Sequence, residues 1–302
     1  MSKACKIWLI VAASLVVAGL AVFAVGFAMS EFDIMAFVSA KAVENTCEIR
    51  ESFESVSIDL TTADVKILPS DDGACRVISS DAEKISYEVR VSNNELVITR
   101  IDNRKWYDHI QIGSLNNRVT VYLPKDQYTD MKITVDTADV SIPKDFSFEN
   151  VTVLSSTGDV CCKASASELL RVKTATGDID VEGVSAGKME LSVSSGAIMM
   201  KNAKCGTDLS IISSTGDVTL ERVVATGKFN INTGTGDVEF DRCDASEISV
   251  KTSTGDVEGS LLTDKTFDVE TSTGKVNVPK NTTGGICRVK TSTGDINLWV
   301  QK

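Results

Sequence analysis

The sequence lacks most of the residues from which enzyme sites are built. It has one histidine, His109, four prolines and three tryptophans among 302 residues, and aromatic residues make up 6% of the chain. No Gly-x-Ser-x-Gly sequence, Cys/His pair or metal-ligand spacing accompanies the single histidine. Carboxylates are abundant, but their positions follow a repeat, so the acid and base of a glycosidase cannot be assigned among them. These absences predict a protein that is not an enzyme and has no cofactor.

Proline is scarce, and no long amphipathic helix pattern occurs beyond the N-terminal segment. The chain has instead a repeat, because a Thr/Ser-Gly-Asp-Val/Ile phrase returns eight times at intervals of 19 or 20 residues. The repeat glycines are Gly158, Gly177, Gly196, Gly216, Gly236, Gly255, Gly274 and Gly294. A fixed period of this length predicts a solenoid, in which each supersecondary unit covers the open face of the next.

Apolar residues alternate with polar ones on both sides of each repeat glycine. Around Gly236 they are Phe229 and Ile231 before it, and Val238 and Phe240 after it. A step of two is typical of a strand with one buried face, so each coil should hold two short strands. Inward residues lie an odd number of positions before the glycine and an even number after it. The alternation is therefore shifted by one residue at the glycine, which indicates a corner that needs positive φ.

The same pattern continues upstream, around Ala138 and around Ala63. We therefore predict an all-β fold, a single β-solenoid of coils of 19–20 residues over 47–302, preceded by one transmembrane helix. Residues 47–130 are expected to form irregular N-terminal coils, and 131–302 regular ones. About a dozen rungs at about 4.8 Å each would give a rod roughly 55–60 Å long.

Residues 7–29 form an apolar run without a charge, long enough to cross a membrane as a helix. Residues 1–6 hold two lysines and would stay in the cytoplasm, while 30–46 would be a spacer that leads to a solenoid outside the cell. A cleaved signal peptide is the alternative, since small residues stand near the end of the run. A retained single-pass anchor is favoured because the apolar region of a signal peptide usually has only about 7–15 residues.

The chain is acidic, with 31 Lys+Arg against 42 Asp+Glu. Without Lys3 and Lys6, the part beyond the predicted anchor has 29 basic and 42 acidic residues. Such a body disfavours nucleic acid and anionic lipid surfaces as partners.

Seven of the eight cysteines lie beyond the predicted anchor. Cys162 and Cys287 occupy inward positions of the repeat, as small buried residues commonly do. We expect mostly reduced thiols, and Cys47 with Cys75 is the one pair for which a disulfide is conceivable.

The aspartates after the repeat glycines would form a column along the stack, and a row of carboxylates can attract calcium. They are Asp139, Asp159, Asp178, Asp217, Asp237, Asp256 and Asp295. A structural role, in which each Asp accepts hydrogen bonds from its own turn, is the favoured interpretation. Ala197 and Lys275 interrupt the column without ending the repeat, and the Gly-Gly-x-Gly-x-Asp spacing of calcium-binding β-rolls is absent from the sequence. We predict no metal, with calcium on this column as the alternative.

Thr and Ser residues directly before the repeat glycines would form a second column, of hydroxyl groups. We expect this column to rigidify the rod. A flat Thr array can also bind an ordered surface, such as ice or a polymer.

Aromatic and charged residues crowd together in one place, between Arg104 and His109, which includes Trp106 and Tyr107. Arg104, Trp106 and Tyr107 could contact a partner, because aromatic residues and Arg are favoured at contact sites. Packing of Trp106 and Tyr107 on the irregular N-terminal coils is the favoured alternative.

Several segments together resemble a known family. They are the anchor start Lys6-Ile7-Trp8-Leu9-Ile10, Leu68-Pro69-Ser70-Asp71-Asp72-Gly73, Arg104-Lys105-Trp106-Tyr107-Asp108, Val121-Tyr122-Leu123-Pro124-Lys125, Gly259-Ser260-Leu261-Leu262 and the Ser-Thr-Gly-Asp copies. With these segments, the chain resembles the bacterial membrane-anchored β-strand-repeat proteins labelled "putative adhesins", a domain class of unknown function. The resemblance implies a β-solenoid outside a bacterial membrane and carries over no catalytic residues.

The leading functional hypothesis is a non-enzymatic surface protein that presents the solenoid for adhesion or envelope interaction, with an envelope protein or wall polymer as partner. The alternative is an accessory protein in envelope-stress signalling that acts through a membrane partner. Ile296, Leu298 and Val300 are expected to form the last rung. An uncovered last rung would allow end-to-end self-association.

Overall fold

The computed structural model describes residues 3–29, 43–81, 85–103, 117–280 and 283–301. The helix in these ranges, α1, spans Lys3–Met29, so it begins before the predicted start at residue 7. Its stretch Cys5–Val25 has a mean hydropathy of 2.6 and is long and apolar enough to cross a membrane. These properties fit a membrane anchor or a signal sequence.

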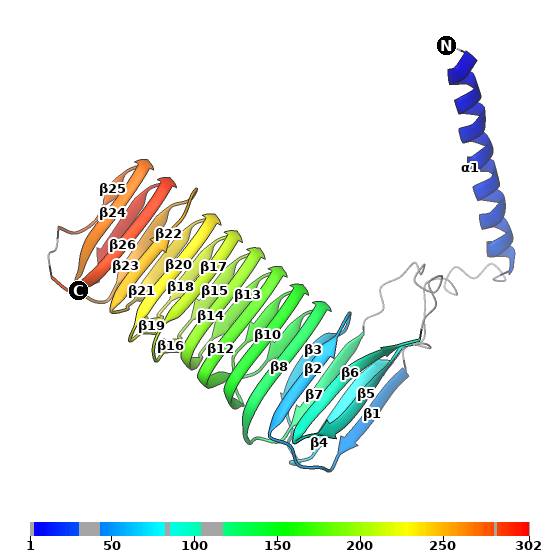
Figure 1. The fold of residues 1–302 in the computed structure, drawn as a ribbon, viewed down its shortest axis with the longest axis horizontal. Helices are drawn as coiled ribbons and strands as arrows, with labels where there is room; N and C mark the ends of the chain where they lie inside the picture. The colour runs from blue at the N-terminus through cyan, green and yellow to red at the C-terminus, as the bar shows by residue number, and fades with distance from the viewer. Residues whose placement is uncertain (1–2, 30–42, 82–84, 104–116, 281–282, 302) are drawn as a thin grey trace.

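Two long sheets face each other and form the solenoid (Figure 1). The first sheet has the spatial order β1 (Val43–Ile49), β4 (Cys75–Asp81), β7 (Arg118–Leu123), β3 (Asp64–Pro69), β9 (Val140–Ile142), β11 (Val160–Cys162), β13 (Ile179–Glu182), β15 (Ile198–Lys201), β18 (Val218–Glu221), β21 (Val238–Cys243), β23 (Val257–Leu261), β27 (Ile296–Val300) and β25 (Val276–Asn277).

The second sheet runs β24 (Lys265–Thr273), β26 (Gly285–Thr293), β22 (Glu247–Lys251), β20 (Lys228–Thr235), β17 (Leu209–Thr215), β14 (Ser185–Ser195), β12 (Ser165–Thr176), β10 (Ser147–Thr157), β8 (Gln127–Thr137), β2 (Ser55–Leu60), β6 (Glu95–Asp102) and β5 (Ile85–Ser92). Two short strands, β16 (Lys204–Cys205) and β19 (Val224–Ala225), pair beside it. The predicted all-β solenoid is confirmed.

The core lies between the two sheets and follows the predicted alternation. Phe229 and Ile231 of β20 and Val238 of β21 are 0% exposed, and Phe240 is 2% exposed. Each coil thus buries the inward side chains of two strands, and the next coil covers their open side.

The corner requires glycine for two reasons, a positive φ and the lack of room for a Cβ atom. Gly216 has φ +134°, and a Cβ atom there would lie 2.0 Å from the carbonyl oxygen of Gly196 in the neighbouring rung. Any side chain would therefore push the coils apart at this corner, which explains why glycine returns at each of the eight repeats.

The third side of the coil is less regular than the two sheets. Val184, Val223 and Cys243, seven residues after their glycines, are buried, but Leu262 is 43% exposed. A residue seven after the glycine was expected from the sequence to be apolar and to anchor this side, and for Leu262 that is wrong, because Leu261 is 0% exposed and takes the inward place.

The N-terminal coils contain antiparallel pairs. β1 pairs with β4, β4 with β7, and β5 with β6. β1 begins at Val43, inside the predicted spacer 30–46 and before the predicted start of the solenoid at residue 47. Residues 30–42 of that spacer lie outside the described residues.

The chain does not fill the rungs in sequence order at either end. At the N-terminal end, β2 lies between β6 and β8, and β3 lies between β7 and β9. At the C-terminal end, β26 lies between β22 and β24, and β27 lies between β23 and β25. The first coil of the chain and the last are therefore each covered on both sides.

The prediction that Ile296, Leu298 and Val300 form the last rung is wrong for this reason. Ile296 and Leu298 are 0% and 2% exposed, since β27 is an interior strand. The outermost rung consists of β24 and β25, which the chain forms before it returns to fill the gap (Figure 1).

Lys265 lies where the chain crosses to the outermost rung. Its ammonium group donates to Asp244 Oδ1 at 2.6 Å, to the Ala245 carbonyl at 2.8 Å and to Thr263 Oγ1 at 2.8 Å. The side chain is only 3% exposed. Three acceptors match its three donors, as a buried ammonium requires. Lys265 thus fixes the crossing segment to the coil that precedes it.

Candidate functional site

The predicted aspartate column exists, and its hydrogen bonds run between rungs. The Oδ1 atom of each Asp accepts from the backbone N–H of the equivalent residue in the next rung. In each pair the residue named first donates its N–H. Four of these bonds are 2.8 Å long: Asp159 to Asp139, Asp178 to Asp159, Ala197 to Asp178 and Asp256 to Asp237. The others are Asp139 to Asp64 at 3.1 Å, Asp237 to Asp217 at 2.9 Å, Asp295 to Asp256 at 2.7 Å and Lys275 to Asp295 at 2.7 Å. The expectation that each Asp bonds its own turn is therefore wrong.

The two residues that interrupt the column, Lys275 and Ala197, lie in different structural settings. Lys275 stands in the outermost rung, where no further coil of the described residues offers an N–H to a carboxylate. Ala197 stands in the interior, so the N–H of Asp217 receives no carboxylate from the rung below it. All hydrogen bonds of the column thus point the same way along the stack. Each Asp accepts from the backbone N–H of the coil that lies next to it in space.

Calcium at Asp159, Asp178, Asp217, Asp237, Asp256 and Asp295, the alternative to the predicted absence of a metal, is untested. Within the described part of the chain, no three His, Cys, Asp or Glu side chains gather as a possible metal-ligand group. The carboxylates are exposed, and one oxygen of each already accepts a hydrogen bond from a backbone N–H of the neighbouring rung.

The predicted hydroxyl column lies beside the aspartates and is in register along the stack. Its members, here called the hydroxyl strip, are Thr137, Thr157, Thr176, Ser195, Thr215, Thr235, Thr254, Thr293 and Thr273 in spatial order. Their side chains are exposed. From Thr176 onward in this order, their backbone carbonyls accept from repeat glycines, as in the Gly158 N–H to Thr176 bond of 2.9 Å. The backbone is therefore fixed, and the hydroxyls repeat about every 4.8 Å.

A second row of hydroxyl residues lies inside the same corner and was not predicted. Thr174 and Thr291 are 1% exposed. Thr174 Oγ1 donates to the Gly158 carbonyl at 3.3 Å, and Thr291 Oγ1 donates to the Gly255 carbonyl at 3.2 Å. These residues continue the buried face of their strands, and the structure reveals the glycine carbonyls as their partners.

The opposite corner contains residues in the left-handed backbone region. Asn202, Arg222 and Arg242 have φ of 52°, 53° and 53°, each six residues after its repeat glycine, and Gly183 has φ 68° at the same place. A non-glycine residue in this region is uncommon. These four positions share a backbone angle but no residue type, so no sequence pattern indicates this corner.

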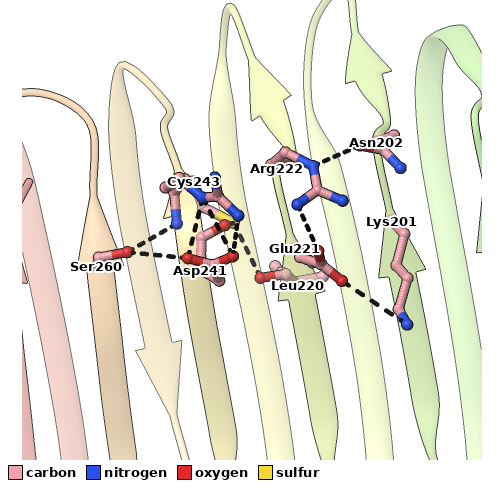
Figure 2. Close-up of polar contacts among 9 residues, drawn as sticks. Lys201, Asn202, Leu220, Glu221, Arg222, Asp241, Cys243 and Ser260 are labelled. Carbon is pink, nitrogen blue, oxygen red and sulfur yellow. Dashed lines mark hydrogen bonds and ion pairs between the residues drawn. The ribbon is translucent and has the colours of Figure 1, made fainter.

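Charges at this corner are paired within the corner (Figure 2). Arg222 approaches Glu221 at 2.5 Å, and Lys201 lies 3.7 Å from the same carboxylate. Arg222 Nε also donates to Asn202 Oδ1 at 2.6 Å. In the next rung, a hydrogen bond from Arg242 holds the pKa of Asp241 below its usual value. The corner is a set of ion pairs on an exposed surface rather than a nucleophile with a base.

Two shallow depressions also contain charged side chains of both signs. One, of about 400 Å³, is lined by Asp64, Lys66, Arg118, Asp139 and Ser141 among others. The other, of about 470 Å³, contains the Lys125–Asp145 pair at 3.4 Å. Neither brings together a nucleophile, a base and a group that orients the base. Arg104, Trp106, Tyr107 and His109 lie outside the described residues, so their predicted contact role is untested.

Five of the eight cysteines are buried. Cys162 and Cys287 are 0% exposed, as predicted. Burial raises the pKa of each of these thiols to about 12. Cys47 is exposed on β1 and Cys75 is buried on the neighbouring β4, and both are free thiols.

Three solved structures are similar to this chain at low identity. A "putative adhesin" from Parabacteroides merdae ATCC 43184 has a TM-score of 0.52 at 12% identity, over 88% of this chain and 98% of that chain. A second from Parabacteroides distasonis ATCC 8503 gives 0.49 at 12%, over 87% and 99%, and a third from Bacteroides fragilis NCTC 9343 gives 0.47 at 12%, over 86% and 98%. The first of these supports the solenoid fold.

No curated protein matches the sequence. The family model described as Toastrack DUF4097 matches residues 53–221 and again 206–302, which together cover most of the chain. The resemblance predicted from the sequence is confirmed: the chain belongs to the Toastrack DUF4097 family.

Proposed function

We propose that this protein is a non-enzymatic surface protein, held in the cell membrane by α1, whose solenoid binds a wall polymer or another envelope component outside the cell. The apolar helix of suitable length and the membership of the Toastrack DUF4097 family support this proposal. The structural neighbour from Parabacteroides merdae is described as a "putative adhesin", which agrees with a role in adhesion.

The orientation is inferred from the charges on either side of the helix. Lys3 and Lys6 precede the apolar run, and Glu31 and Asp33 come after it. The positive-inside rule then puts the N-terminus in the cytoplasm and the solenoid outside.

The observation that carries the proposal is the hydroxyl strip. It offers the same hydroxyl group in nine successive rungs on a fixed backbone. A single hydroxyl contact is weak, but many contacts to one polymer chain add up, since later contacts form within the bound complex. A repetitive polymer is the kind of partner that such a surface can bind.

The test is co-sedimentation of the full chain, reconstituted in nanodiscs, with insoluble peptidoglycan. Thr215→Val, Thr235→Val and Thr254→Val together remove three neighbouring hydroxyls and keep the β-branched shape. We expect at least a tenfold loss of binding. The matched control carries Thr134→Val, Thr152→Val and Thr219→Val, which lie on the outer faces of the sheets, and should bind normally. Failure of the unmodified chain to sediment, or equal loss in both triple variants, would contradict the proposal.

A further inference from the structure

The C-terminal end of the solenoid is an incomplete rung. In the described residues, β24 pairs only with β26 and β25 only with β27, so each has an open edge. Val269 of β24 is half-buried, whereas Val289, its register partner one rung inside, is 1% exposed. Val276 of β25 is 48% exposed. Apolar groups that other rungs cover are therefore left open here.

The two ends of the solenoid differ in the direction of their outer strands. At the N-terminal end, antiparallel strands β1, β4 and β5 form the outer part of the sheets. At the C-terminal end, the parallel stack stops at a strand of nine residues, β24, with no antiparallel partner among the described strands. An open strand edge presents backbone donors and acceptors to which an extended segment can add.

The charges of the last two strands at this edge are opposite in sign, basic on β26 and acidic on β24. Arg288 of β26 lies 2.6 Å from Glu247 of β22 and 3.8 Å from Asp268 of β24. Lys290 of β26 lies 2.9 Å from Glu270 of β24. The side chains of Asp268 and Glu270 are 76% and 68% exposed and are the last charges of these rows. A strand that continued the alternation would place basic side chains opposite them.

We propose that the open rung binds an extended segment of a partner protein by strand addition to β24, and that this segment alternates apolar residues with basic ones. The apolar side chains would cover Phe267 and Val269, while the basic ones would face Asp268 and Glu270. A second copy of the chain fits less well, because its own Asp268 and Glu270 would meet the same two carboxylates. This binding does not depend on the hydroxyl strip.

β26 already has the required pattern, so its sequence supplies the probe. The peptide is Gly-Ile-Val-Arg-Val-Lys-Thr-Ser-Thr, which corresponds to Gly285–Thr293 with Cys287→Val. A second peptide has Glu in place of both basic residues. Fluorescence anisotropy of each labelled peptide is measured against the full chain in nanodiscs. We expect saturable binding of the basic peptide and at least tenfold weaker binding of the acidic one.

Charge reversal on the protein completes the test. Asp268→Lys with Glu270→Lys should invert the preference, so that the acidic peptide binds better. Asp268→Ser with Glu270→Ser is a milder variant that should weaken the basic peptide without adding repulsion to Arg288 and Lys290. The matched control is Glu239→Lys with Glu258→Lys, which makes the same change in net charge on exposed positions of β21 and β23 and should leave both peptides unaffected.

Three outcomes would overturn the proposal. One is the absence of saturable binding by the basic peptide. Another is a preference between the peptides that does not change in the Asp268 and Glu270 variants. The third is a concentration-dependent dimer of the unmodified chain, seen by light scattering and lost in those variants, which would assign the open rung to a second copy.

Discussion

An aspartate in this solenoid stabilises the coil that lies on it rather than the turn that contains it. Asp237 Oδ1, for example, accepts from the N–H of Asp256, which belongs to the next rung. A corner N–H without an acceptor would be a polar group that is hard to satisfy between stacked coils. The residue needed at each corner is therefore set by the neighbouring coil in the stack. The sequence predicted the column, but it could not show whether each Asp bonds its own turn or the neighbouring coil, because the repeat is the same in both cases.

The two interruptions of the column should respond to substitution in opposite ways. Ala197→Asp would supply the carboxylate that the Asp217 N–H lacks and should raise the free energy of unfolding by about 1 kcal/mol. Lys275→Asp would place a carboxylate in the outermost rung, where no N–H awaits it, and should give no gain. Urea unfolding followed by circular dichroism measures both. An equal gain in the two variants would show that the effect of Asp lies within its own turn.

The buried thiols predict a loss of stability at alkaline pH. The pKa of Cys162 and of Cys287 is raised to about 12 by burial, so the folded chain keeps these protons while the unfolded chain releases them above pH ~9. Stability from these groups is complete below pH ~9 and declines as pH rises towards 12, by about 1.4 kcal/mol per pH unit for each thiol.

The check is the pair of substitutions Cys162→Val and Cys287→Val in one chain. Between pH 9 and 11 its free energy of unfolding should fall less steeply than that of the unmodified chain, by about 2–3 kcal/mol per pH unit. At pH 7.5 the two chains should differ little. Parallel curves would mean that these thiols do not titrate on unfolding.

At the scale of elements, the sequence predicted the features that depend on local alternation. The two strands on either side of Gly236 and their inward residues were predicted correctly, because a period of two directly reports a buried face. The antiparallel pairing of β1 with β4 was not predicted, since it joins segments that have no repeat in common. The hairpin of β5 and β6 turns at Asn93 and Asn94, with φ of 53° and 64°, which fits a tight two-residue turn.

The position of each strand in the stack predicts how much its core residues matter. Val289 and Val269 are register partners on β26 and β24, but Val289 is interior and Val269 lies in the outermost rung. Val289→Ala should therefore lower the free energy of unfolding by about 2 kcal/mol, and Val269→Ala by less than about 1 kcal/mol. Stacking in sequence order would put Val289 outermost and reverse this ranking, which chemical unfolding of the two variants would reveal.

At the scale of the whole molecule, the sequence could not predict the order of the rungs. Every regular coil offers similar apolar faces above and below, so hydrophobic burial alone does not distinguish one order from another. Two single residues fit the order observed, namely Lys275 at the end of the aspartate column and buried Lys265 at the crossing. These residues look like ordinary departures from a repeat until the coils are seen in space.

The rung order also determines which surface the end of the rod presents. Because the last coil of the chain fills an interior place, the open edge belongs to β24 and β25, with Asp268 and Glu270 beside it. End-to-end association, predicted from a different last rung, stays an untested prediction. The acidic charge of the rod opposes it.

Disulfide trapping at the C-terminal end tests this order most directly. Asn297 lies opposite Glu258 in one neighbouring strand, and two rungs separate Glu258 from Asn277. Neighbouring strands are about 4.8 Å apart, within the range for a disulfide, and two rungs span about 9.6 Å, beyond it. Under mild oxidation, Glu258→Cys with Asn297→Cys should form a cross-link that peptide mapping detects, and Glu258→Cys with Asn277→Cys should not. A cross-link in the second pair and none in the first would contradict the observed rung order.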